Sequence, residues 1–239
     1  MPIARIKRRH PADGGYARGE ETRARIVTTA LRVFGEEGFT KASTRQIAAD
    51  AGVNPPALQY YFGGKEGLHR ACAQFIIDRV MIIIAPALAE ARQVRQHTQR
   101  DRAIDALCAL LDSMADALVA AGSESWSRFI TRGKADGAGP AIGMLRQNIA
   151  MPIMLTVAQL IAIVTAGDPS DELIRVKATA IFGQISTFLT NRESTLEALN
   201  WTDFDTQRLQ IIKTVVREHT RAILGARAGS PRRATGELR

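Results

Sequence analysis

The sequence is poor in the residues that mark secreted, metal-binding and membrane-spanning proteins. It contains two cysteines, Cys72 and Cys108, and four histidines, and these residues form no spaced metal-binding motif. The basic N-terminus is not followed by the apolar stretch of a secretory signal. The longest apolar run, residues 80–88, is too short to cross a bilayer. These absences predict a cytoplasmic protein with reduced thiols, no cofactor, no metal and no membrane association.

Positive charge is concentrated at the two ends of the chain. The formal net charge is +8, and residues 1–10 supply four basic side chains and no acidic one: Arg5, Lys7, Arg8 and Arg9. Residues 226–239 hold four arginines and one glutamate, so the body of the chain is nearly neutral. We expect a flexible basic arm over 1–19 and a disordered basic tail over 226–239. We hypothesise that the arm reaches DNA outside the main groove contact.

Apolar residues recur every three or four positions through most of the chain, and no strand-like alternation persists. This period predicts an all-α fold with a three-helix head over 20–65 and a larger helical body over 66–225. Gly38 should end the first helix, and a glycine-rich loop should cover 133–139. The expected helices span 20–37, 43–51, 54–61, 65–95, 101–121, 124–132, 140–165, 171–191 and 204–224.

Residues 43–65 have the layout of a helix-turn-helix. Two short helices flank the tight turn Ala51-Gly52-Val53, and Ser43 with Gln46 forms a capping box. The second helix starts after Asn54 with two prolines and should enter the major groove by its N-terminal end. Leu58 and Phe62 should face inward. The side chains expected to reach DNA bases or phosphates are Thr44, Arg45, Asn54, Pro55, Ala57, Gln59, Tyr60, Tyr61 and Lys65.

At these residues the chain resembles a known family. The run Thr44–Leu68, TRQIAADAGVNPPALQYYFGGKEGL, and the preceding FGEEGF resemble the DNA-binding head of TetR-type repressors. The run Tyr60–Gln74, the run Ile181–Arg192, IFGQISTFLTNR, and the later Leu-Asn-Trp are similar to the CecR branch. The resemblance implies that Thr44, Arg45, Gln59, Tyr60, Tyr61 and Lys65 touch DNA. It also implies that the last two long helices pair across a two-fold axis, and that an effector binding in the body alters the separation of two heads.

The recognition helix departs from many relatives at its first turn. It starts Asn54-Pro55-Pro56, where those relatives have a small polar or basic residue. Two prolines remove two N–H donors. The base specificity of relatives therefore cannot be carried over to this chain.

The apolar residues of the body support two further predictions. Segments 171–191 and 204–224 are more apolar than a monomer body requires, so we place them at a homodimer interface. The first presents Leu173, Val176, Ala180, Ile181, Ile185 and Phe188, and the second presents Phe204, Leu209, Ile212, Val215, Val216 and Ile223. A largely apolar effector could bind at an adaptable pocket, although ordinary core packing explains the same residues: Met114, Trp126, Phe129, Met151 and Met154.

The pattern favours a DNA-binding transcriptional regulator, a repressor that a small molecule releases from a palindromic double-stranded operator. Two alternatives stay open: an architectural DNA-binding protein without an effector, and an all-α enzyme with an accessory DNA-binding head. The scattered histidines form no triad or metal set, which argues against the enzyme. His69 and Cys72, one helical turn apart, are expected to pack against the head and not to bind a metal.

Overall fold

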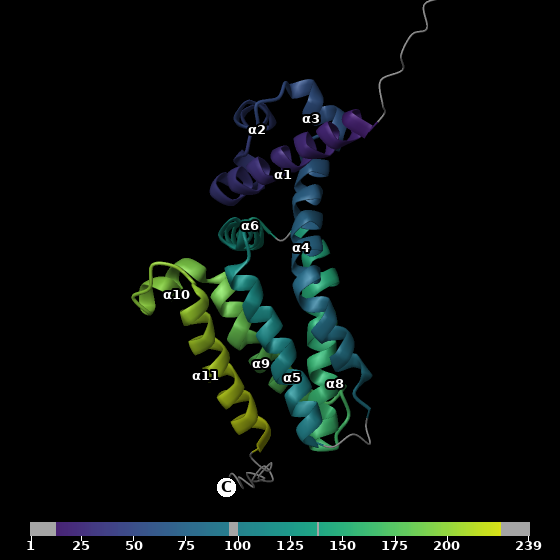
Figure 1. The fold of residues 1–239 in the computed structure, drawn as a ribbon, viewed down its shortest axis with the longest axis vertical. Coiled ribbons are helices and arrows are strands. Elements are labelled where there is room, and N and C mark those ends of the chain that lie inside the picture. Colours follow the sequence, from purple (N-terminus) through teal and green to yellow (C-terminus); the bar gives the residue numbers. More distant parts are fainter. Residues whose placement is uncertain (1–12, 96–99, 138, 226–239) are drawn as a thin grey trace, which may run out of the picture. The chain divides into compact units, whose positions relative to one another are not determined.

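The computed structural model describes residues 13–95, 100–137 and 139–225, and within these ranges it contains helices and no strands (Figure 1). The predicted all-α class is confirmed. The basic residues of the arm, at positions 5–9, and the tail over 226–239 lie outside the described residues.

The chain divides into two compact units. The head unit comprises the chain up to Phe75 together with Arg128–Met144, and the body unit comprises Ile76–Ser127 together with the chain from Leu145 onward. The head unit is thus larger than the 20–65 segment expected from the sequence. Two helices, α4 (Lys65–Gln93) and α6 (Ser123–Ala135), run from one unit into the other.

The head unit is built on three N-terminal helices: α1 (Asp13–Lys41), α2 (Thr44–Asp50) and α3 (Pro55–Phe62). The predicted end of the first helix is confirmed, because Gly38 interrupts α1 with φ +82° and ψ 167°. The prediction that residues 13–19 are a flexible arm was wrong, since they form the first turns of α1. Once a helix has started, each added residue gains a backbone hydrogen bond, and this outweighs the three glycines that favoured coil.

The core of the head unit joins α1 to the helices on either side of it. Ile26, Leu31 and Phe34 of α1 are buried, as are Ile47 of α2 and Leu58 of α3. The second half of α6 and the short helix α7 (Pro140–Leu145) belong to the same unit. The Phe129 ring lies 6.4 Å from the Phe34 ring, and the Asp136 carboxylate accepts the Phe39 N–H at 3.0 Å. These contacts explain why a distant segment joins the head.

The body unit packs its long helices around α5 and α8. These helices are α5 (Arg100–Asp116), α8 (Met151–Thr165), α9 (Glu172–Thr190) and α11 (Thr206–Gly225), and α8 lies against both α5 and α9. Helix α11 lies along α5 (Figure 1). Three ion pairs four residues apart on α11 fix its register against α5: Lys213–Asp116, Arg217–Asp112 and Arg221–Asp105.

Three local features differ from the sequence prediction. Helix α6 continues to Ala135, into the expected loop at 133–139. The expected helix over 140–165 is interrupted by a π-helical turn, Arg146–Ala150. A short helix, α10 (Arg192–Ala198), lies between α9 and α11 and was not predicted. Apolar periodicity cannot reveal the last two features, because one π turn or a seven-residue helix leaves too few repeats to recognise.

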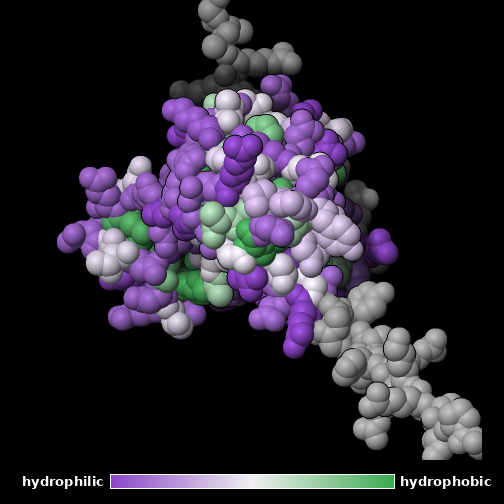
Figure 2. Space-filling view, turned by 90° about the horizontal axis from the view of Figure 1, so that it is seen from above, coloured by the Kyte–Doolittle hydropathy of each residue, from purple (hydrophilic) through white to green (hydrophobic). Residues whose placement is uncertain are grey.

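Two stretches of the chain, Lys65–Gln93 and Pro140–Thr165, are long and apolar enough to cross a bilayer by length and composition alone. Core helices of soluble proteins pass the same test, so this is weak evidence for a membrane span. The most apolar window of each stretch is 39% and 44% buried, respectively. The face of the molecule drawn in Figure 2 is mostly hydrophilic, with small apolar areas between the polar side chains.

Candidate nucleic-acid interface and effector site

The helix-turn-helix is closed by side-chain caps at the start of both of its helices. The Ser43 hydroxyl accepts the Gln46 N–H at 3.4 Å, and the Asn54 Oδ1 accepts the Ala57 N–H at 3.0 Å. Half of the predicted capping box is therefore present, while the Gln46 amide donates to Asp50 instead. The structure ends α3 at Gly63, which adopts φ +69°, a left-handed conformation that suits glycine.

Two arginines of α1 hold the helix-turn-helix in place. Arg25 Nε donates to the carbonyl of Ala51, in the turn, at 2.8 Å. Arg32 binds the carboxylates of Glu36 at 3.0 Å and Asp50 at 2.6 Å. The hydrogen bond to Asp50 is the main cause that raises the pKa of Arg32. The position of the turn is thus set from α1, and the outer face of α3 takes no part in these contacts.

The outer face of α3 is open. Pro55, Pro56, Gln59 and Tyr60 are exposed, and Tyr60, at 84%, is the most exposed large apolar side chain among the described residues. Tyr61 is half-buried, with its ring edge-to-face against Tyr60 at 5.3 Å. The structure therefore brings together most of the residues that the sequence assigned to the groove.

The remaining predicted DNA contacts differ in their exposure and in their contacts within the head unit. At the start of α2, Arg45 is exposed and Thr44 is half-buried; Ala57 of α3 is half-buried. The Lys65 ammonium donates to the Thr40 carbonyl at 3.0 Å and lies 5.0 Å from the centre of the Phe39 ring. Lys65 has partners within the head unit that the sequence did not indicate.

His69 and Cys72 are buried at the packed side of α4, as predicted. The His69 ring lies 4.8 Å from each of the rings of Phe34, Phe39 and Phe129. Burial lowers the pKa of His69 to about 4, and the nearby Lys65 ammonium adds to this effect while Asp136 opposes it. Burial raises the pKa of the Cys72 thiol. In the three described ranges, no group of three His, Cys, Asp or Glu side chains could hold a metal ion.

The five predicted effector residues are divided between the units. Met114 and Trp126 are buried in the body unit, where Met154 is half-buried and Met151 is 40% exposed. Phe129 belongs to the head unit. A separate cavity of about 390 Å³ lies in the body unit between the end of α4 and the end of α8. Sequence reasoning missed this cavity, whose lining includes Val94, Gln159, Ala162 and Ile163.

The faces of α9 and α11 differ from the predicted interface. Ile181 and Ile185 of α9 are 0% and 2% exposed, so their placement at a dimer interface was wrong. The same correction applies to four residues that are 3–5% exposed: Phe204, Leu209, Ile212 and Val216. Both helices have an inner apolar face, and periodicity does not tell which apolar face is covered. The outer apolar residues are Leu173 and Val176 of α9, and Ile211, Val215 and Ile223 of α11.

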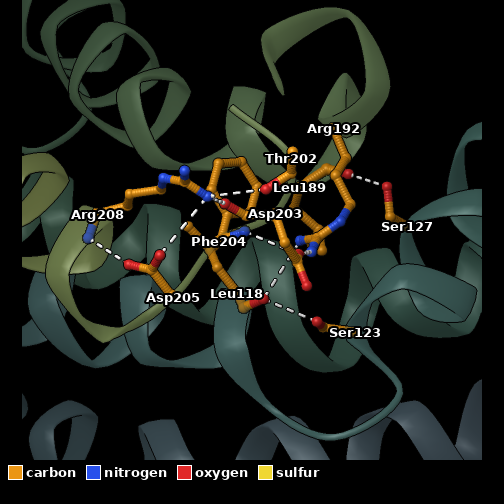
Figure 3. Close-up of polar contacts among 10 residues, drawn as sticks. All are labelled: Leu118, Ser123, Ser127, Leu189, Arg192, Thr202, Asp203, Phe204, Asp205 and Arg208. Atoms are coloured by element: carbon orange, nitrogen blue, oxygen red, sulfur yellow. Dashed lines mark hydrogen bonds and ion pairs between the residues drawn. The ribbon is translucent and has the colours of Figure 1, made fainter. Parts of the chain in front are cut away.

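A buried arginine anchors the segment between α9 and α11 (Figure 3). Arg192 is 6% exposed, donates to the Leu118 carbonyl at 3.3 Å and pairs with Asp203. Its guanidinium lies 4.5 Å from the centre of the Phe204 ring. Nearby, Ser127 donates to the Leu189 carbonyl. The contacts of Arg192, the first residue of α10, fix the position of this short helix.

Comparisons with known proteins agree with this architecture. Residues 26–72 match the model of the tetR family of bacterial regulatory proteins. Residues 103–227, more than half of the chain, match the C-terminal domain of the HTH-type transcriptional dual regulator CecR. The chain is 32% identical to CecR of Shigella flexneri over 87% of this chain and 93% of the relative.

The chain belongs to the TetR family and to its CecR branch. It is therefore a DNA-binding transcriptional regulator with a helix-turn-helix head. The regulator RaaS of Mycobacterium tuberculosis is 40% identical over 65 residues, 27% of this chain and 30% of the relative.

Solved structures show the same fold at low sequence identity. AibR in complex with isovaleryl coenzyme A and operator DNA has a TM-score of 0.58 and 17% identity, covering 82% of this chain and 96% of AibR. The fatty acid degradation regulator FadR of Bacillus halodurans has a TM-score of 0.57 and 15% identity, covering 85% of this chain and 98% of FadR.

Proposed function

We propose that this TetR-family protein is a cytoplasmic homodimeric repressor, released from a palindromic operator by a small, largely apolar molecule. The observation that carries the DNA-binding part is the open outer face of α3, next to a turn that Arg25 holds through the Ala51 carbonyl. A two-fold dimer places two such helices on an inverted repeat, with heads separated by about 34 Å or a related helical repeat. We propose no catalytic activity for it.

The outer apolar faces of α9 and α11 support the dimer. Several large apolar residues stay exposed on these two helices, among them Leu173 and Val176, which are 60% and 59% exposed. Exposed apolar side chains on two helices that contact each other are a feature of association surfaces. Pairing of the two helices with their copies would cover them across a two-fold axis.

The body unit is the proposed effector site. Met114, Met151 and Met154 offer flexible apolar side chains there, and Trp126 adds a rigid apolar ring; methionines adapt to irregular ligands. Phe129 is the weakest member of the predicted set, because its ring already packs against His69 and Phe34. AibR, which has the same fold, is solved in complex with isovaleryl coenzyme A and operator DNA, and this likeness supports an effector with an apolar acyl part for this chain.

Selection of genomic DNA fragments by the full-length protein tests the proposal. We expect enrichment of fragments that share an inverted repeat, and a synthetic copy of that repeat should bind in a gel-shift assay. A ligand found by thermal shift should weaken operator binding, and the operator should weaken ligand binding by the same factor. Enrichment without an inverted repeat and without any ligand effect would favour the architectural alternative.

A further inference from the structure

The face that α3 presents to solvent carries no formal charge. Pro55, Pro56, Gln59 and Tyr60 are exposed with the spacing of one helix face, and Leu58 is buried on the other side. The eight residues of α3, PPALQYYF, include no acidic or basic side chain. The groups available to meet base edges are therefore two apolar rings, one amide and one phenol.

This composition excludes the main ways of reading G·C pairs from α3. In the major groove, guanine is recognised chiefly by arginine or lysine, and cytosine by glutamate or aspartate. Three basic side chains near the helix-turn-helix have partners inside the head unit. Arg25 binds the Ala51 carbonyl, Lys65 binds the Thr40 carbonyl, and the Arg23 guanidinium lies 5.5 Å from the centre of the Phe62 ring. Arg45 lies on α2, where it is exposed and suited to a phosphate.

The same composition fits A·T pairs. A glutamine amide can pair with both N6 and N7 of adenine, and apolar side chains contact the 5-methyl group of thymine. Pro55 and Pro56 occupy the first turn of α3, the end of a recognition helix that enters the groove. Asn54 is less suited to adenine than Gln59, because its Oδ1 already accepts the Ala57 N–H at 3.0 Å.

We propose that α3 reads A·T base pairs, with Gln59 recognising adenine and the rings of Pro55 and Pro56 recognising thymine methyl groups. The assignment rests on the proposed function, because it requires sequence-specific binding through α3. It specifies the chemistry of the half-site: the positions covered by α3 are A·T pairs, whereas positions read by other parts of the head are unconstrained.

The first test removes single methyl groups from the operator. The positions under α3 are those at which Gln59→Ala, Pro55→Ala or Pro56→Ala changes the sequences selected from a random library. In the synthetic operator, deoxyuridine then replaces thymine at each of these positions, and binding of the full-length protein is measured. We expect about a fourfold loss of affinity for each methyl group that a proline ring contacts. Thymines in the flanking sequence serve as controls and should tolerate the replacement.

Matched variants connect the methyl effect to the prolines. Pro55→Ala and Pro56→Ala should each bind the thymine operator more weakly and should distinguish thymine from deoxyuridine less at the position that the replaced ring contacts. Pro140→Ala changes an exposed proline at the start of α7 and should keep the full distinction. Thermal unfolding of each variant verifies that the head is folded. In the same way, 7-deazaadenine, which lacks N7, should weaken binding by the wild type but not by Gln59→Ala.

Two results would overturn the assignment while leaving the proposed function intact. One is selection of G·C pairs at the positions that respond to Gln59→Ala. The other is specific binding that is insensitive to deoxyuridine at every half-site thymine. A protein that selects no DNA sequence at all would instead refute the proposed function, and the readout with it.

Discussion

The proposed dimer interface predicts that one substitution on α9 breaks the dimer, whereas another on the same helix lowers the stability of the protomer. Val176 and Ile185 both lie on α9, but Val176 is 59% exposed and Ile185 is 2% exposed. Val176→Glu should leave the protomer folded and separate the dimer. Ile185→Glu should strongly destabilise the protomer, because it places a carboxylate inside the body core.

The expected magnitudes follow from burial in the two states. An exposed substitution usually changes protomer stability by less than about 0.5 kcal/mol. In a two-fold interface, however, Val176→Glu buries two carboxylates, and a buried charge without a partner costs about 3 kcal/mol or more. The sum of about 6 kcal/mol raises the dimer dissociation constant by roughly four orders of magnitude. For Ile185→Glu the same kind of penalty falls on a protomer that is stable by only about 5–15 kcal/mol.

Light scattering and thermal unfolding, measured on each variant, separate these outcomes. Val176→Glu should be monomeric with an almost unchanged melting temperature, and it should lose operator affinity because one head reads only a half-site. Ile82→Glu is the control, since Ile82 is 73% exposed but lies on α4. A Val176→Glu protein that stays dimeric, or a monomeric Ile185→Glu protein with an unchanged melting temperature, would refute the assignment of the outer face.

Four further predictions follow from the head and body units. Lys65→Met should weaken binding to all DNA sequences about equally, because neither a phosphate contact nor the hydrogen bond to the Thr40 carbonyl distinguishes bases. Gel shifts on operator and random DNA measure this effect. A change in the selected sequence would contradict the prediction. Arg25→Met should lower operator affinity about tenfold through loss of the bond to the turn, while Arg102→Met, at an exposed arginine on α5 of the body unit, should not. Folding lowers the pKa of His69 to about 4, so between about pH 6.5 and 4 the unfolded chain binds a proton at His69 and the folded chain does not. The free energy of unfolding should therefore fall as pH drops through this range. His69→Phe should remove this pH dependence, as measured by unfolding curves at a series of pH values. Met154→Ala should weaken a confirmed effector in calorimetry, whereas Ala162→Trp, which fills the separate cavity, should not; the reverse would move the effector site to that cavity.

The local features of the helix-turn-helix could be predicted from the sequence because they depend on neighbouring residues. Ser43 caps α2 through the N–H three residues later, and Asn54 caps α3 in the same way. Gly38 ends the regular part of α1 through its left-handed φ. The spacing of Ile47 and Leu58 placed them in the core, where they are 0% and 3% exposed. Each of these predictions needed only the chemistry of a short segment.

The parts that could not be predicted depend on contacts between distant segments. Lys65 was expected at a phosphate, but its ammonium meets a carbonyl 25 residues earlier in the chain. The body residue Arg192 reaches the carbonyl of Leu118, 74 residues away, and so holds α10. Phe129 looked like a pocket residue by its neighbours, but it packs on the His69 ring of the head unit. No local pattern specifies such partners.

The sequence by itself determined that the chain is all-helical, that residues 43–65 form a helix-turn-helix, and that the solvent-facing residues of α3 lack charge. Helical period, caps and turns are set by interactions within a few residues, so the order of residues contains them directly. Only the tertiary structure decided which of two apolar faces on α9 and α11 is covered. Both faces satisfy the same helical period, and Ile185 differs from Val176 only in what packs against it.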